Sequence, residues 1–428
     1  MIDVYQEGAF EVERVIVRAE LLERTWSNKE ELWITPRYWR GAPCTPNHGK
    51  PVALMGDYVV FLSYIYHYQQ TYTWVSIDDI DGPIAFKYAV PAWGIFTHYL
   101  DPVERTLFVL LPLHEPSLKV IGIQVGVWGP HVAIEYSVSL RSHAEVNCLT
   151  VDNGLVCINH CRHVNNPDRF DFDVLDLERR MLSQFSSMDT RSILPPDMSP
   201  DLQGLYSFAT ETHIIHIYGG KYFAVFRRSD QGVQSQSPME LPEPVLKGQF
   251  PGFFDLECGL HIIPRSSVSL AVVGIEQLGR HWLREPSQIN IHLLYMDLSD
   301  SVASVKEVSS LNIPGELKSS VLPTPPLSAQ YALGALSVKQ RRQDGSAEDG
   351  TGYKCYALRI DLPDVFERGL AGLGRGHMTL NRMYLTPAVD EKGEEALFCH
   401  FNPFYGKALL SVNPSSPADS VLVLDYFV

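Results

Sequence analysis

The sequence lacks any run of roughly 18 consecutive apolar residues, the length that a membrane-spanning helix needs. Its first residues show neither the basic nor the apolar segment of a signal peptide, and no Asn-x-Ser/Thr glycosylation signal occurs. The seven cysteines are odd in number and widely scattered, which is typical of reduced thiols rather than of a disulfide framework. We therefore expect a cytoplasmic or nuclear protein without a membrane partner.

Basic residues are scarce as well. The chain has 35 Lys and Arg against 50 Asp and Glu, which gives a formal net charge of −15 at pH 7. A protein that binds DNA or RNA needs a basic face for the phosphate backbone. We therefore expect no nucleic-acid partner.

Common catalytic signatures are missing. Neither Gly-x-Ser-x-Gly nor His-Glu-x-x-His occurs in the chain. The glycine-rich segment 369–376 lacks the Lys-Ser/Thr pair of a phosphate-binding loop, so we interpret it as a connecting loop. We expect neither enzyme activity nor a cofactor.

Candidate metal ligands occur in three patterns, and none meets the requirements of a site. Segment 157–163 holds two cysteines and two histidines, but zinc sites need a second ligand pair further along the chain. His213 and His216 are expected to face opposite sides of a strand, one buried and one exposed. The acidic runs 78–82 and 168–173 are interpreted as turn and strand residues, because no glutamate completes a calcium-loop pattern. We predict no metal site.

Aromatic residues and one recurring phrase are abundant. The chain holds 20 Tyr, 19 Phe and 7 Trp, residues that favour strands. The phrase consists of two strand-forming residues, an aspartate and an apolar residue, and is clearest in Phe172–Leu177. Further copies, two of them without the aspartate, lie at 76–80, 121–123, 224–227, 295–298, 359–362 and 422–426.

The copies lie about 58 residues apart on average between Asp78 and Asp425. Each repeat also contains further strand and turn patterns, among them Asn153-Gly154, a strong hairpin signal. A strand unit repeated in this way predicts an all-β fold, a β-propeller with seven blades of four antiparallel strands. Six to eight blades fit the spacing, and a pair of β-sandwiches is the alternative fold.

Two segments are distinguished along the chain. Residues 1–30 are predicted to form a short N-terminal helical segment, because apolar residues from Val12 to Trp26 recur at three- and four-residue intervals. Residues 31–428 are predicted to form the propeller. The last repeat would lack a fourth strand and expose a sheet edge, so we expect a strand near 32–35 to close the propeller there.

Several segments resemble a known family. Leu21–Trp26, the strand Leu32–Ile34 and the strand Gly56–Val60 follow one another as in F-box-like proteins of mushroom-forming (basidiomycete) fungi, in the region downstream of the F-box. The phrase Val174–Leu177 also fits that family. The resemblance implies an adaptor that presents a target to a ubiquitin ligase through its propeller, with a Skp1-type ligase subunit as a partner. The F-box itself, which opens with a Leu-Pro-x-Glu-type phrase, is not visible in the sequence.

Aromatic and basic residues near turns are candidates for partner contact, because Tyr, Trp and Arg dominate binding hot spots. Tyr68 and Tyr72 flank the turn of the first predicted hairpin, and Arg37 and Trp39 form a second basic-aromatic group. We therefore predict a non-catalytic protein-binding propeller. The alternative is an enzyme or glycan-binding propeller whose site lies at the central channel.

Overall fold

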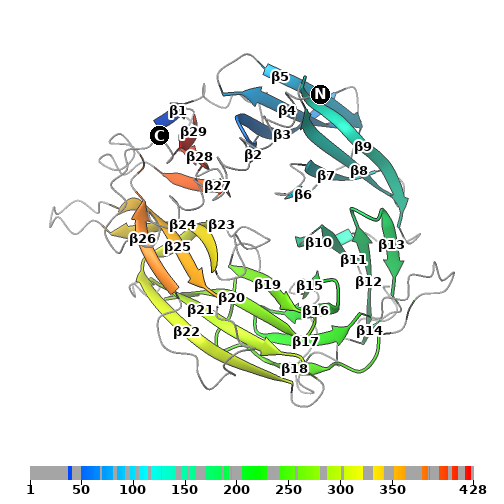
Figure 1. Ribbon diagram of the computed structural model, residues 1–428, viewed down its shortest axis with the longest axis vertical. Helices are drawn as coiled ribbons and strands as arrows, with labels where there is room; N and C mark the ends of the chain where they lie inside the picture. Colours follow the sequence, from blue (N-terminus) through cyan, green and yellow to red (C-terminus); the bar gives the residue numbers. More distant parts are fainter. Residues whose placement is uncertain are drawn as a thin grey trace, which may run out of the picture.

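The computed structural model shows an all-β protein, a propeller of seven blades arranged in a ring (Figure 1). The structure describes residues 37–40, 50–67, 70–80, 84–91, 97–101, 106–113, 117–126, 128–140, 146–152, 154–160, 169–185, 188–189, 191, 194, 205–228, 239, 241–255, 259–279, 287–299, 303–321, 331–341, 351–362, 378–383, 385, 395–402, 407–412 and 420–425. The predicted helix within 1–30 and the predicted strand at 32–35 lie outside these residues. The predicted seven-bladed propeller is confirmed.

The blades follow one another in chain order around the ring. Blade 1 comprises β2 (Lys50–Met55), β3 (Tyr58–His67), β4 (Gln70–Asp79) and β5 (Ile84–Pro91), and blade 2 comprises β6 (Thr97–Asp101), β7 (Thr106–Pro112), β8 (Ser117–Gly126) and β9 (Gly129–Ser139). Blade 3 comprises β10 (Val146–Asp152), β11 (Leu155–His160), β12 (Arg169–Asp176) and β13 (Met181–Gln184), with the short β14 (Met188–Asp189) also paired to β12.

Blade 4 comprises β15 (Leu205–Ala209), β16 (His213–Tyr218), β17 (Tyr222–Arg227) and β18 (Leu246–Gln249), and blade 5 comprises β19 (Leu260–Ser266), β20 (Ser269–Leu278), β21 (Gln288–Asp297) and β22 (Ser304–Pro314). Blade 6 comprises β23 (Glu316–Val321), β24 (Tyr331–Arg341), β25 (Thr351–Asp361) and β26 (Met378–Met383). Blade 7 comprises β27 (Ala396–Asn402), β28 (Lys407–Val412), β29 (Ser420–Asp425) and, from the other end of the chain, β1 (Arg37–Arg40).

Each copy of the recurring phrase marks the third strand of a blade. The copies lie on β4, β8, β12, β17, β21, β25 and β29. This strand is paired on both edges and covered on both faces by neighbouring blades, so its apolar residues belong to the core. A repeat in the sequence therefore corresponds to a largely enclosed strand of each blade in the fold.

The aspartate of the phrase shapes the turn that leaves this strand. The carboxylate of Asp176 accepts a hydrogen bond of 2.8 Å from the backbone N–H of Arg179, and that of Asp297 accepts one of 2.9 Å from Ser299. Such short-range carboxylate bonds are why aspartate favours turns. The next residue, Leu177, is buried and donates its N–H to Gly154 O in the turn between the first two strands.

The core consists of apolar layers between adjacent blades. Strands β11 and β16 are buried along their whole length, because a neighbouring blade covers each face. One cluster of buried side chains fills each space between neighbours, and the cluster between blades 7 and 1 is the smallest in the described part of the chain. The middle of every blade is therefore structural, which leaves the two ends of the blades for function.

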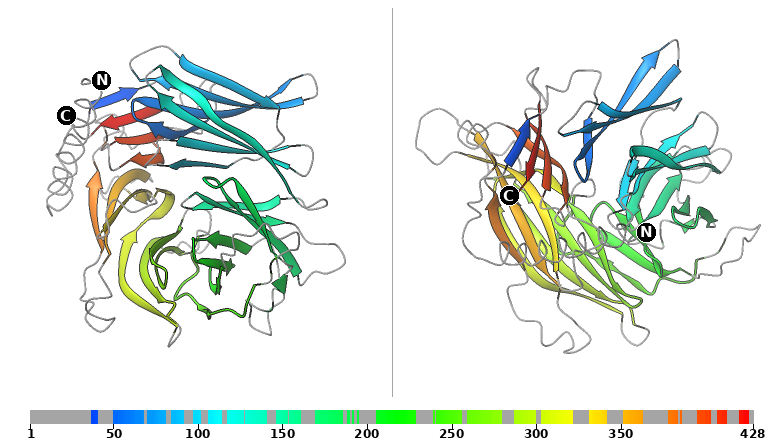
Figure 2. Two further views of the ribbon diagram at one scale, coloured as in Figure 1. Left: turned by 45° about the vertical axis from the view of Figure 1, so that its right-hand side comes forward. Right: turned by 45° about the horizontal axis from the view of Figure 1, so that its top comes forward.

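Strand β1 closes the ring by pairing with β29. The antiparallel register joins Arg37 to Asp425 and Arg40 to Leu422. In Figure 2 the dark-blue β1 lies beside the red β29, although the two come from opposite ends of the chain. Without β1 the edge of β29 would be unpaired, a state that β proteins avoid.

We predict that deleting residues 1–40 lowers the free energy of unfolding by about 2–4 kcal/mol, because four backbone pairings of the closing strand are lost. Deleting residues 1–30 keeps β1 and serves as the control, with a smaller loss. Urea unfolding of the two truncated proteins measures the difference. Equal stabilities of the two would show that β1 does not hold the ring.

Candidate functional site

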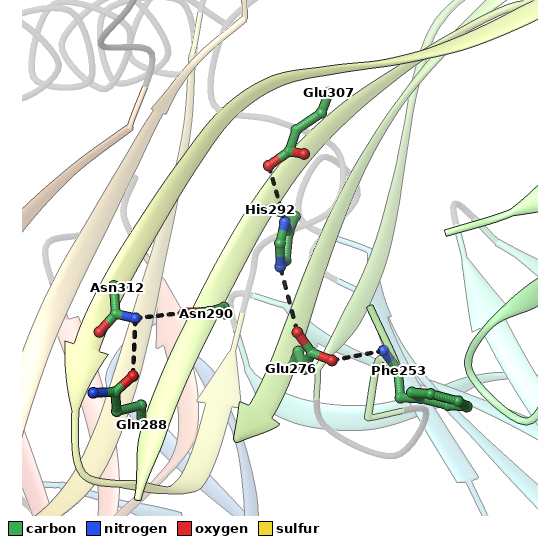
Figure 3. Close-up of polar contacts among 7 residues, drawn as sticks. All are labelled: Phe253, Glu276, Gln288, Asn290, His292, Glu307 and Asn312. Atoms are coloured by element: carbon green, nitrogen blue, oxygen red, sulfur yellow. Dashed lines mark hydrogen bonds and ion pairs between the residues drawn. The ribbon is translucent and has the colours of Figure 1, made fainter. Parts of the chain in front are cut away.

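A polar surface lies where the long strands of blade 5 extend past the shorter strands of blade 4. Strands β20, β21 and β22 have 10, 10 and 11 residues, whereas β16, β17 and β18 have 6, 6 and 4. The polar side chains there form what we call the blade-5 array, shown in Figure 3: Glu276, Gln288, Asn290, His292, Glu307 and Asn312.

Strand register brings the array together. Glu276 on β20 is paired with Asn290 on β21, and Asn290 is paired with Asn312 on β22. Directly paired residues of neighbouring strands point to the same face of a sheet, and so do residues two apart on one strand, such as Asn290 and His292. Glu307 joins this set through the register shift that follows Leu293 on β21.

An imidazole lies between two carboxylates at the centre of the array. His292 Nδ1 is 3.0 Å from Glu307 Oε1, and His292 Nε2 is 3.8 Å from Glu276 Oε2 (Figure 3). The side chains of His292 and Glu276 are 11% and 14% exposed, whereas that of Glu307 is 39% exposed. Because His292 Nε2 makes no hydrogen bond, the hydrogen bond between Nδ1 and Glu307 is the one that orients the imidazole ring.

Amide side chains continue the array along the strands. Asn312 Nδ2 donates a hydrogen bond of 2.7 Å to Asn290 Oδ1 and is 3.4 Å from Gln288 Oε1. These amides are exposed, so their remaining donors and acceptors face water. Such groups can recognise polar atoms of a bound molecule but supply no nucleophile.

An exposed phenylalanine borders the array. Phe253 is 60% exposed, and its backbone N–H donates a 3.0 Å hydrogen bond to Glu276 Oε1. Lys221 Nζ lies 4.1 Å from the centre of the Phe253 ring, within cation–π range. Phe253 therefore stands on the surface as an aromatic anchor beside hydrogen-bonding groups.

The neighbouring Phe254 fixes this segment to the sheet. Its backbone N–H donates to Gly220 O, and its ring is 5.6 Å from the imidazole of His292. The ring also lies over Gly274, where an added Cβ would come within 2.2 Å of it. The site therefore depends on glycine at position 274, because any side chain there would displace Phe254.

The sequence-predicted contact residues lie elsewhere. Tyr68 lies outside the described residues, and Tyr72 is half-buried on β4, at the end where β3 and β4 meet. Arg37 and Trp39 are on β1 of blade 7, where the structure describes the backbone pairing with β29. Arg37 is paired with Asp425, at the end of the third strand of blade 7, whereas Tyr72 lies near the start of the third strand of blade 1. The two residues are therefore at opposite ends of the propeller. Their roles in binding stay predictions.

The histidine pair of β16 departs from the expectation of one buried and one exposed side chain. His213 and His216 are both buried. His216 Nδ1 is 2.7 Å from Ser207 Oγ, and burial lowers the pKa of His216 to about 3. The expectation was wrong because blades cover both faces of β16, so alternation of side chains along the strand does not bring either face to water.

Other histidines are equally enclosed. His160 Nε2 lies 2.7 Å from Asp173 Oδ2, and both side chains are fully buried in blade 3. Among the residues that the structure describes, no group of three or more His, Cys, Asp or Glu side chains is arranged to hold a metal ion. No helix in the described part of the chain is long and apolar enough to cross a membrane.

Known proteins share little sequence with this chain. No protein-family model matches the chain, and no curated protein matches it. The WD40 domain of SCAP from fission yeast aligns with a TM-score of 0.39 and 10% identity, covering 89% of this chain and 84% of that chain. The polysaccharide lyase Uly1 aligns with a TM-score of 0.39 and 8% identity over 89% of this chain and 90% of that chain.

A hypothetical selenium-binding protein from Sulfolobus tokodaii aligns with a TM-score of 0.41 and 11% identity, covering 90% of this chain and 93% of that chain. The chain is thus a seven-bladed β-propeller, distantly similar in structure to WD40 domains and to other propellers. These likenesses do not extend to any activity or partner.

We predict that Gly274→Ala lowers the free energy of unfolding by about 1–3 kcal/mol, because the new Cβ overlaps the Phe254 ring. Combining it with Phe254→Leu, which removes ring atoms, should make the two costs less than additive. Urea unfolding of both single variants and the double variant measures this coupling. Strict additivity would contradict the close packing of Phe254 on Gly274.

Proposed function

We propose that this protein is a non-catalytic binding propeller that contacts a protein partner with the blade-5 array and Phe253. The observation that carries the proposal is an exposed aromatic side chain whose backbone is hydrogen-bonded to a polar array on a rigid sheet. Aromatic anchors surrounded by polar groups are the usual centre of protein interfaces. The fold leaves such surfaces at the ends of the blades, where loops and strand ends vary without disturbing the core.

The position of Phe253 distinguishes it from the other large exposed apolar side chain in the described residues. Trp128 is 99% exposed in the turn between β8 and β9, where third and fourth strands join. Phe253 lies next to the turn between β16 and β17, where second and third strands join, because Phe254 N–H donates to Gly220 O in that turn. The two side chains are therefore on opposite ends of the propeller, and only Phe253 borders a polar array.

The family resemblance names a partner class. It implies that the propeller recognises a target for a ubiquitin ligase, so a Skp1-type subunit is a proposed second partner in the same assembly. Binding of a Skp1-type subunit would be independent of the blade-5 array if it used the segment that precedes the propeller, which is part of the family resemblance.

We predict that Phe253→Ala lowers recovery of the main partner at least about tenfold in pull-downs from native-source extract, a loss typical of an anchor residue. Trp128→Ala is the matched control and should leave recovery unchanged. Mass spectrometry of the captured proteins gives both values, and it also tests for a Skp1-type subunit or a cullin. Equal recovery by the wild type and Phe253→Ala would contradict the proposed surface.

A further inference from the structure

Two histidines converge on the seam where blade 7 meets blade 1. His400 on β27 accepts a 3.3 Å hydrogen bond at Nδ1 from the backbone N–H of Leu54 on β2. His98 on β6 of blade 2 forms a hydrogen bond with the backbone of Val52. Val52 lies on β2, two residues before Leu54. The first strand of blade 1 is thus tied to both of its neighbours in the ring by an imidazole.

The bond to Leu54 defines the protonation state of His400. A ring nitrogen that accepts an N–H bond carries no proton, so the imidazole is neutral with its proton on Nε2. Burial and, to a smaller extent, the nearby His98 together lower the pKa of His400 to about 4. Burial also lowers the pKa of His98, while its bond to the Val52 backbone opposes that shift.

The seam has fewer apolar contacts than the other blade junctions described. Its cluster consists of Leu54, Val59, Phe61, Leu409, Val421 and Val423. Among the described residues, the further titratable groups on the strands of the seam include the exposed Lys50 at the start of β2, the half-buried Cys399 beside His400, and Lys407, whose Nζ pairs with Asp57 across the same seam. A greater share of the seam's cohesion therefore depends on polar bonds.

We propose that His400 and His98 form an acid-sensitive latch at the seam that closes the propeller. Protonation of His400 at Nδ1 removes the acceptor of the Leu54 N–H and places a cation in the seam, close to the His98 imidazole. Strand β2 then separates from β27 while the apolar junctions elsewhere in the ring persist. The latch is closed at neutral pH and weakens as the pH falls.

The direction follows from proton linkage. An exposed histidine titrates near pH 6.5, so the opened seam binds a proton between about pH 6.5 and pH 4 that the closed seam does not bind. The contribution of His400 to closure is therefore complete above about pH 6.5 and declines toward about pH 4. For this histidine alone, the opening equilibrium at about pH 5 should exceed that at about pH 7.5 by roughly 10- to 30-fold.

Hydrogen–deuterium exchange of the Leu54 amide tests the latch. After correction for intrinsic exchange rates, the opening equilibrium at Leu54 should rise by roughly 10-fold or more from about pH 7.5 to about pH 5. The amide of Ile121 in β8 reports opening of the whole fold, so it should stay far better protected than Leu54 at each pH. Opening at Leu54 that is independent of pH, or that matches Ile121, would overturn the proposal.

His400→Gln separates titration from hydrogen bonding. The glutamine side-chain oxygen can accept the Leu54 N–H but does not titrate, so the pH response at Leu54 should disappear while His213→Gln in blade 4 leaves it intact. A response that persists in His400→Gln would overturn the proposal. If that variant does not fold, His98→Gln should reduce the response by removing a neighbouring imidazole that lowers the pKa of His400, and an unchanged response there would overturn the proposal as well.

Discussion

The structure depends on the packing of each sheet between two neighbouring sheets. The third strand of each blade carries apolar side chains on both faces, and these fill the layers on either side. In blade 3, Leu175 points toward blade 2 and Val174 toward blade 4. Because the layers form a closed circle, no blade can leave without exposing two apolar faces. This constraint explains why polar residues in the middle of a sheet, such as His160 and Asp173, are enclosed, and why the polar blade-5 array lies at strand ends.

Apolar packing contributes least at the junction that closes the ring. Blades 1 to 6 are each formed from consecutive strands, whereas blade 7 combines the two ends of the described chain. The junction between blades 7 and 1 has the smallest apolar cluster described, and polar bonds across it involve His400 and Lys407. In a ring built from consecutive hairpins, the closing seam is therefore where we expect a change in pH to affect stability most.

The sequence was sufficient for the fold because the phrase repeats once in every blade, on a strand whose middle is buried. Residues such as Asp176 and Asp297 mark both the strand and its turn, so the number of copies indicated seven blades, although the spacing also fitted six or eight. The candidate site could not be predicted in this way. Glu276, His292 and Glu307 lie on three strands, and only the register and the shift after Leu293 bring them together. The one local signal was the aromatic pair Phe253-Phe254 after a Pro-Gly turn in a polar connection.

We propose that a protein partner binds the end of the propeller that bears Phe253, and cross-linking of the captured complex locates the partner on the propeller. Lys221 lies over Phe253, whereas Lys306 is paired with Tyr295 nearer the opposite end of blade 5. We predict that lysine-reactive cross-links to the partner form at Lys221 and not at Lys306. Cross-links at Lys306 without any at Lys221 would show that the partner binds elsewhere and would contradict the proposed surface.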